Sequence, residues 1–154
     1  MKIREIISKD EEATVKLISI ADNRSKDVSR KKFEKCLKKN NMAMFVAEEG
    51  NKLIGYLVIK ELEKENKETE EIVGDKIINF AHINWIAVHP DFRGRKIASF
   101  LLKYSETWAK KKQKIGIWLD CNKRVINLYI KNKYVFIGNY NYKGKIRNIM
   151  LKIF

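Results

Sequence analysis

Two long apolar segments enclose one amphipathic segment in the middle of this chain. The run KIINFAHINWIAV (76–88) is nearly continuous in apolar residues, which is typical of a central strand buried on both faces. Pro90 ends the run. Residues 97–111 have apolar side chains at helical spacing and finish in lysines that suit a helix C-terminus, and KIGIWLDC (114–121) is apolar again. A strand, a helix and a strand in this order predict one parallel crossover.

The segments on either side of this crossover predict further helices and strands. Before it we expect a strand at 1–6, helices over 11–21 and 29–39 with Ser29 as the cap of the second, and a hairpin around EEGN (48–51). After it we expect a short helix over 124–132 and a closing hairpin over 134–154. Helices and strands alternate only in the middle, so the predicted class is α/β (α+β) with a mixed sheet.

The polar segment KENKETEEIVGD (64–75) carries most of the local acidic residues. We interpret it as a solvated hairpin loop, and an acidic docking patch for a cationic substrate is the alternative.

The chain is strongly basic. It has 33 lysine and arginine residues against 19 aspartate and glutamate residues, and its formal net charge is +14. Lysines are scattered through every segment, and the interleaved aromatic and basic residues of an RNA-binding sheet are missing. The charge therefore predicts a general attraction for anionic ligands and argues against nucleic acid as the partner.

Length and patterning predict one domain, residues 1–154, with a core of its own. The N-terminus MKIREIISKDEE lacks the apolar core of a signal peptide, and no later run is long enough to cross a bilayer. We therefore expect a cytoplasmic monomer or homodimer with no membrane partner. Cys36 and Cys121 lie far apart, without a histidine at metal-ligand spacing, so we expect neither a disulfide nor a metal site.

The turn FRGRKIA (92–98) joins the strand to the helix of the crossover, where backbone N–H groups can hold a phosphate. Arg93, Gly94, Arg95 and Ala98 suit such a cradle, whereas Lys96 stands where a second glycine would allow the closest approach to a ligand. We expect Lys96 to take right-handed helical angles and to donate its N–H to the phosphate. A basic surface turn is the alternative.

The element order resembles the GNAT superfamily of acyl-CoA-dependent N-acyltransferases over essentially the whole chain. The resemblance is most specific in IAVHPDFRGRKIASFLL and WLDCNKRVINLYIKNKYVF. The family turn runs Arg or Gln, two variable residues, Gly, one variable residue, then Gly or Ala. Arg93 and Ala98 match its ends, and Lys96 departs from its middle glycine.

A second part of the resemblance follows the next strand. Asn122 and Tyr129 keep the family spacing between an asparagine and a tyrosine of a short helix, while Lys133 and Tyr134 replace the usual Gly-Phe pair.

The resemblance implies a mixed, mostly antiparallel central sheet of about seven strands flanked by about four helices. It also implies acetyl-CoA as co-substrate and no metal. The backbone of Ile86, Ala87 and Val88 would line the pantetheine arm, and one of these N–H groups would stabilise the oxyanion. Further coenzyme contacts would come from Arg93, Gly94, Arg95, Lys96, Ile97, Ala98, Ser99, Asn122 and Tyr129.

The implied reaction moves an acetyl group from acetyl-CoA to the primary amine of a small molecule or a peptide N-terminus. Tyr129 would protonate the leaving thiolate, although a tyrosine here also suits helix packing. Asp120 and His82 are both candidates for the proton acceptor, and the sequence does not choose between them. No histidine partner follows Cys121, which favours direct attack in a ternary complex over an acyl-enzyme.

An acyl-CoA-binding sensor or pseudoenzyme is the alternative function. In the family the acceptor is shaped by the region between the first two helices, here residues 21–28, and by the closing hairpin near 141–145. Both segments are rich in basic residues and have no distinctive motif. A peptide N-terminus, a polyamine or amino acid, and an antibiotic amine all stay open as acceptors.

Overall fold

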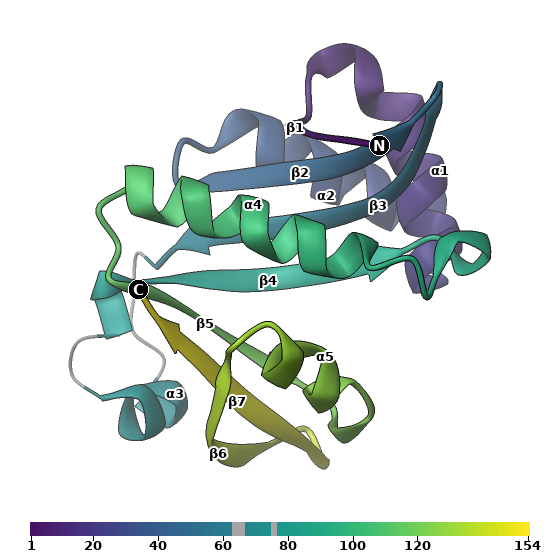
Figure 1. Cartoon of the computed structure of the whole chain (residues 1–154). Helices are drawn as coiled ribbons and strands as arrows, with labels where there is room; N and C mark the ends of the chain where they lie inside the picture. The colour runs from purple at the N-terminus through teal and green to yellow at the C-terminus, as the bar shows by residue number, and fades with distance from the viewer. Residues whose placement is uncertain (63–66, 75–76) are drawn as a thin grey trace. The chain divides into compact units, whose positions relative to one another are not determined.

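The computed structural model describes residues 1–62, 67–74 and 77–154 (Figure 1). Its strands are β1 (Lys2–Glu5), β2 (Met42–Glu49), β3 (Lys52–Glu61), β4 (Phe80–Val88), β5 (Gly116–Cys121), β6 (Val135–Tyr142) and β7 (Lys145–Ile153). Its α-helices are α1 (Glu11–Asp22), α2 (Lys26–Lys38), α3 (Lys67–Val73), α4 (Ile97–Lys111) and α5 (Ile126–Lys131). None of the helices in these ranges is long and apolar enough to cross a membrane.

The strands form a seven-stranded mixed sheet in the order β1-β2-β3-β4-β5-β7-β6. β1 with β2, β2 with β3, β5 with β7 and β6 with β7 are antiparallel pairs. β4 pairs with β5 in parallel over Phe80–His82, and α4 connects these two strands. The predicted crossover and the mostly antiparallel sheet with four main helices are therefore confirmed.

The chain divides into two compact units. The N-terminal unit comprises residues 1–60 and 84–105, and the C-terminal unit comprises residues 61–83 and 106–154. Both β4 and α4 contribute residues to each unit. The single domain of residues 1–154 stays a prediction.

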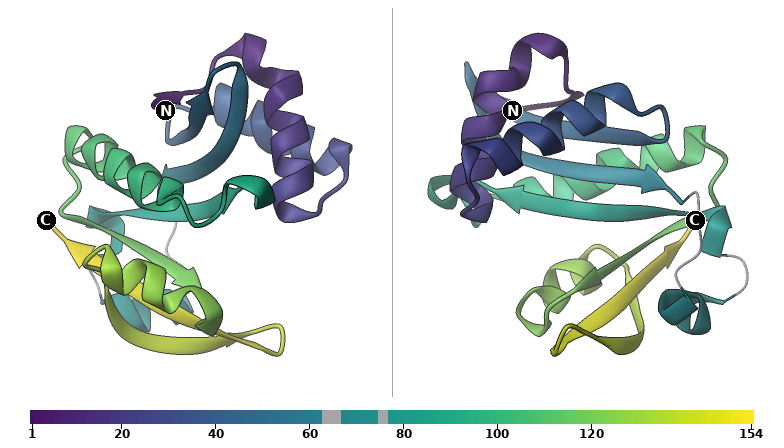
Figure 2. Two further views of the ribbon diagram at one scale, coloured as in Figure 1. Left: turned by 45° about the vertical axis from the view of Figure 1, so that its right-hand side comes forward. Right: turned by 180° about the vertical axis from the view of Figure 1, so that it is seen from behind.

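In the N-terminal unit, α1 and α2 cover one face of β2 and β3 (Figure 2). Their apolar side chains form one buried cluster with the strands, which includes Leu17, Ile18, Phe33, Cys36, Met44, Val46, Tyr56 and Val58. Burial of such side chains is the main favourable contribution to folding. The helix α2 begins earlier than predicted, because Ser25 is its cap and accepts from the N–H of Val28 at 3.3 Å. Ser29 instead lies buried inside the helix.

The helix α4 packs on the opposite face of the same strands (Figures 1 and 2). Gly55 of β3 allows this close approach, because a Cβ at that position would lie 3.0 Å from Ile97 Cγ2 and 3.3 Å from the carbonyl oxygen of Ala87. The rings of Phe45 and Tyr104 meet edge to face at 5.0 Å between centroids. These contacts fix the start of α4, where the candidate phosphate turn ends.

The C-terminal unit is built on β5, β7 and β6, with a buried cluster of Ile77, Phe80, Trp118 and Ile149. The prediction of a loop over 64–75 is wrong for residues 67–73, which form α3, while residues 64–66 and 75 lie outside the described ranges. The predicted strand from residue 76 is also too long, because Ile77–Asn79 form a 3-10 turn and β4 begins at Phe80.

Candidate active site

The turn before α4 has an unusual backbone. Gly94 has a φ of 78° and Lys96 a φ of 61°, so both residues lie in the left-handed region. The expectation that Lys96 takes right-handed helical angles is therefore wrong. The Lys96 carbonyl accepts from the N–H of Phe100 at 3.1 Å and so begins the hydrogen-bonding pattern of α4. Left-handed residues in a turn can point neighbouring N–H groups towards one concave side, which is a geometry that binds anions.

The side chains of the same turn differ in what they contact. The Arg93 Nε donates to the carbonyl oxygen of Val88 at 3.2 Å, and this bond holds the turn to the end of β4. Arg95 makes two hydrogen bonds to Glu49, at 3.1 and 2.6 Å, on the exposed surface. Among the described residues, no carboxylate forms an ion pair with Arg93 or Lys96. The turn therefore keeps cationic side chains available to an anionic ligand.

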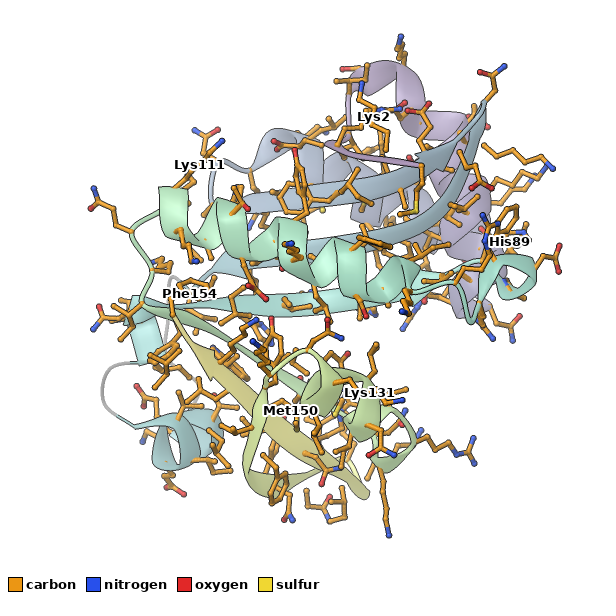
Figure 3. All side chains as sticks on the ribbon, in the orientation of Figure 1. Lys2, His89, Lys111, Lys131, Met150 and Phe154 are labelled. Atoms are coloured by element: carbon orange, nitrogen blue, oxygen red, sulfur yellow. The ribbon has the colours of Figure 1, made fainter. Side chains whose placement is uncertain are left out.

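The strand that leads into this turn becomes more exposed along its length. Phe80–Ile83 are buried, whereas Ile86, Ala87 and Val88 are each only half-buried. The N–H of His89 donates to the carbonyl oxygen of Ile54 at 2.9 Å and ties the end of β4 to β3. Figure 3 shows His89 at the point where β4 passes into the turn. Partly exposed backbone at this end of a strand can pair with an extended, amide-rich ligand.

In the C-terminal unit, the two candidate proton acceptors lie close together. The register of β4 and β5 places His82 opposite Trp118, and their rings stack at 4.0 Å between centroids. The His82 Nε2 is 3.9 Å from Asp120 Oδ1. On the other side, Arg147 Nε of β7 donates to Asp120 Oδ2 at 2.5 Å, and Arg147 also donates to the Asp120 carbonyl oxygen at 3.1 Å.

These neighbours set the charge of Asp120. Burial favours the neutral carboxyl, but the hydrogen bond from Arg147 and the nearby His82 imidazole outweigh it and hold the pKa of Asp120 at about 2. A carboxylate with so low a pKa is a weak base. It can instead stabilise an imidazolium at His82, so the geometry favours His82 over Asp120 as the group that takes up a proton.

Tyr129 lies on α5 and is 5% exposed. Burial raises the pKa of its hydroxyl, Cys121 and Asp120 raise it further and Arg147 lowers it by less, so the phenol keeps its proton at neutral pH. Its ring meets that of Tyr134 edge to face at 6.0 Å between centroids. A protonated phenol can supply a proton to a departing thiolate.

The end of α5 explains the two departures from the family pattern. Lys133 has a φ of 66°, its N–H donates to the Ile130 carbonyl, and the Tyr134 N–H donates to the Tyr129 carbonyl. This is the Schellman arrangement that usually takes glycine at the left-handed position. Lys133 therefore adopts the backbone conformation of the glycine that it replaces, and Tyr134 is buried behind it.

Two other predicted residues have structural partners. Asn122 caps the turn that leads into α5, because its Oδ1 accepts from the Arg124 N–H at 3.0 Å. Cys121 is buried, and burial raises the pKa of its thiol to about 11, so the thiolate needed for nucleophilic attack is scarce. Both cysteines are free thiols. Within residues 1–62, 67–74 and 77–154, no group of three or more His, Cys, Asp or Glu side chains could hold a metal ion.

Arg147 and Trp118 were not predicted from the sequence as neighbours of His82 and Asp120. Both lie on strands whose pairing partners are distant in sequence, since Asp120 is paired with Ile149 across β5 and β7. The alternation of side chains along β7 would have placed Arg147 on the same face as Ile149, but only a known register could bring it to Asp120.

Comparison with known proteins gives one family match. The model described as the acetyltransferase (GNAT) family matches residues 3–134. No curated protein sequence matches the chain significantly.

Several solved structures are similar to this chain. A Bacillus anthracis str. Ames protein described as a streptothricin acetyltransferase, in complex with acetyl coenzyme A, is 23% identical, with a TM-score of 0.66 over 79% of this chain and 68% of that one. An aminoglycoside 6′-N-acetyltransferase complexed with coenzyme A is 14% identical, with a TM-score of 0.79 over 99% and 97%. The ribosomal-protein-S18-alanine N-acetyltransferase of Escherichia coli is 16% identical, with a TM-score of 0.72 over 99% and 92%.

Proposed function

The chain belongs to the acetyltransferase (GNAT) family, whose N-acetyltransferases depend on acetyl-CoA, and from this premise we propose that it acetylates a primary amine by direct attack in a ternary complex. The amine nitrogen attacks the thioester carbonyl carbon and the C–S bond breaks. The nitrogen loses a proton and the thiolate gains one, so the products are an N-acetyl amine and free CoA.

The backbone of the turn before α4 carries this proposal. Gly94 and Lys96 both have positive φ, and the first N–H groups of α4 have no carbonyl partner within the helix. Such a cradle fits the pyrophosphate of acetyl-CoA, because it offers N–H donors at the positive end of a helix dipole. Arg93 and Lys96 would add positive charge there. The remaining proposed contacts to the coenzyme come from Arg95, Ile97, Ala98, Ser99 and Asn122.

The acyl end of the co-substrate would lie along β4. We assign the half-buried backbone of Ile86, Ala87 and Val88 to the pantetheine arm, and one N–H group of this stretch to the oxyanion. A preorganised donor of this kind contributes about 3 kcal/mol to stabilising the transition state.

Two groups of the C-terminal unit would move the protons. His82, beside the fixed carboxylate of Asp120, would take the proton that the amine loses. Tyr129 is protonated at neutral pH and would give its proton to the thiolate. The protonated state of Cys121 supports direct transfer over an acyl-enzyme.

The acyl-CoA sensor remains the alternative function, and one experiment separates the two. Purified protein is incubated with acetyl-CoA and a panel of amines that contains peptides with free N-termini, amino acids, polyamines and aminoglycosides. We expect thiol release, and an acetylated amine by mass spectrometry, only when a suitable amine is present. Thermal shift and calorimetry at low salt measure CoA binding separately. Binding without transfer would support a sensor, and absence of CoA binding would contradict both functions.

Location and assembly stay predictions. An acetyl-CoA-dependent enzyme must be in a compartment that contains acetyl-CoA, and this requirement supports the predicted cytoplasmic location. A monomer or a homodimer is expected, and sedimentation or light scattering would measure which one forms.

A further inference from the structure

A small cavity of about 230 Å³ lies in the N-terminal unit and is lined from α2, the segment before it, β2, β3 and β4. Its apolar wall consists of Val28, Cys36, Met42 and Val58. Its polar wall consists of Arg24, Lys31, Lys32, Lys35, Asn84 and Trp85. Trp85 is 36% exposed, and Lys32 lies over one face of its ring. No residue of the proposed coenzyme site lines it.

Lys32 is held rigidly in this wall. Its side chain is 9% exposed, and its Nζ lies 3.1 Å from Asp22 Oδ2, 3.0 Å from the Tyr56 hydroxyl and 3.7 Å from the centroid of the Trp85 ring. The Tyr56 hydroxyl also donates to Asp22. The Oδ2 of Asp22 therefore serves both Lys32 and the Tyr56 hydroxyl.

The remaining cations of the cavity have no such partner. Among the described residues, no carboxylate forms an ion pair with Arg24, Lys31 or Lys35, and the guanidinium of Arg24 lies 5.6 Å from the centroid of the Trp85 ring. These three side chains are exposed at the rim of the cavity, and an anionic group bound there would be attracted by them. The aromatic face of Trp85 adds an apolar surface to this positive wall.

The cavity lies next to the backbone that we assign to the acyl arm. Asn84 and Trp85 immediately precede Ile86 on β4, and a strand rises about 3.3 Å per residue. Trp85 and Ala87 are two residues apart and so point to the same face of the sheet, and Ala87 packs against the cluster under α1 and α2. A molecule seated on Trp85 would therefore be close to the proposed position of the thioester.

We propose that this cavity binds the carboxylate of the acceptor, so that the acceptor is a small amine that carries an acidic group, such as an amino acid or the acidic end of a short peptide. This inference rests on the proposed function. The cavity is smaller than the range of about 300–1,000 Å³ that is usual for drug-sized ligands, which limits the bound group to a small one. Polycations such as aminoglycosides and polyamines would be repelled by Arg24, Lys31 and Lys35.

The first test compares amines that differ only in the carboxylate. β-Alanine is compared with β-alaninamide, and the dipeptide amide Gly-Glu with Gly-Gln, with kanamycin and spermidine as cationic amines. We expect kcat/KM to be at least about tenfold higher for each acidic member of a pair. Transfer to neutral or cationic amines at an equal or higher kcat/KM would overturn the inference and leave the acetyltransferase proposal intact.

The second test removes the charges. The double variant Arg24→Gln/Lys35→Gln should reduce the preference for the carboxylate about tenfold, while the thermal shift caused by CoA stays unchanged. Lys38→Gln is the matched control, because Lys38 lies on the same helix but does not line the cavity. An unchanged preference in the double variant would overturn the inference.

The third test reads binding without chemistry. Glutarate, which has no amine, is titrated into isotope-labelled protein, and the NMR signals of the Trp85 indole and the Asn84 side chain are followed. We expect both to shift in the natural protein and neither in the double variant. If no amine in the panel is acetylated, the proposed function fails. The titration with glutarate then tests independently whether the cavity binds an anion. Shifts at Trp85 support an anion site, and their absence overturns it.

Discussion

At the scale of single residues, two lysines adopt backbone angles that usually favour glycine. Lys96 has a φ of 61° and Lys133 a φ of 66°, and each replaces a family glycine. An L-residue in the left-handed region costs about 1–2 kcal/mol. Both lysines adjoin a helix terminus whose hydrogen bonds fix the conformation, the start of α4 for Lys96 and the end of α5 for Lys133. The surrounding elements therefore impose the conformation, and the side chain can vary at the cost of some stability.

Substitution of Lys96 should separate backbone strain from charge. Lys96→Gly removes the strain, so we expect its free energy of unfolding to exceed that of Lys96→Ala by about 1 kcal/mol. Both variants lose the ammonium group, so the affinity for CoA should fall in both, by less than about tenfold. The affinity should also depend less on salt concentration than in the natural protein. Arg93→Ala should weaken CoA binding more, because arginine can make bidentate phosphate contacts. Urea unfolding and calorimetry at two salt concentrations measure these effects. Equal stability of the two Lys96 variants would contradict the strain argument.

A matched pair of tyrosines tests the proposed acid. Tyr129→Phe should lower kcat about a hundredfold and leave the affinity for acetyl-CoA nearly unchanged, because its hydroxyl is needed only as the thiolate leaves. Tyr134→Phe is the control. Its hydroxyl is buried without a hydrogen-bond partner in the part of the chain that the structure describes, so its removal should be neutral or stabilising. Steady-state kinetics and urea unfolding distinguish the two roles. An unchanged kcat for Tyr129→Phe, when chemistry limits the rate, would remove Tyr129 from the mechanism.

At the scale of elements, the position of α4 controls the candidate phosphate turn. The helix begins at Ile97 directly after Lys96, and Ile97 and Leu101 pack against Gly55 of β3. Any side chain at position 55 would push the helix away from the strand. The bounds of α4 agree with the prediction of 97–111, because its apolar spacing and its terminal lysines are strong local signals.

Gly55→Ala should therefore destabilise the protein by about 1–3 kcal/mol. The added methyl group would lie 3.0 Å from Ile97 Cγ2, which has little room to move between the strand and the helix. The substitution should cost less in an Ile97→Ala background, because the colliding atom is then missing. Urea unfolding of the four proteins of this cycle measures the coupling. No change on Gly55→Ala would show that α4 does not pack closely on β3.

At the scale of the whole molecule, the excess of positive charge makes each buried carboxylate important. Asp120 is paired with Arg147, and Asp10 accepts two hydrogen bonds from Arg4. Hydrogen bonds from Arg4 outweigh burial and lower the pKa of Asp10, and the hydrogen bond from Arg147 together with the nearby His82 does the same for Asp120. Acid adds protons to a chain that already has a formal charge of +14, so loss of these pairs adds to a general repulsion.

We therefore expect the stability of the protein to fall steeply in acid. The pKa of Asp120 is about 2 when folded and 3.8 ordinarily, so its stabilising contribution is present above about pH 4 and is lost as the pH falls towards 2. The contribution at neutral pH is about 2 kcal/mol. Urea unfolding from about pH 7 to about pH 2.5 at constant ionic strength measures the loss. The Asp120→Asn variant should be less stable than the natural protein at neutral pH and should lose less of its free energy of unfolding on acidification. An equal loss in both proteins would show that Asp120 does not cause the acid sensitivity.

The sequence by itself determined the order of the strands and main helices, the parallel crossover and the resemblance that identified the family. These features depend on apolar periodicity, proline and glycine positions and charged helix ends, which act over a few residues and can be read along the chain. The predicted role of Tyr129 came from the family resemblance, that of His82 from the titration range of histidine, and that of the turn at 93–99 from its basic and small residues together with the resemblance. All three stay predictions. The predictions failed at the start of α2, where Ser25 rather than Ser29 caps the helix, and at α3, which forms in a polar segment that was predicted to be a loop.

Only the tertiary structure decided which residues meet across strands and helices. Arg147 reaches Asp120, and Lys32 reaches Asp22, Tyr56 and Trp85, through pairings between segments distant in the sequence. The same pairings lower the pKa of Asp120 and leave Arg24, Lys31 and Lys35 around one cavity. The left-handed angles of Lys96 and Lys133 have the same origin, because neighbouring elements override the preference of lysine. Distances between segments and the burial of charge exist only in the folded chain, and so they could not be read from residue order.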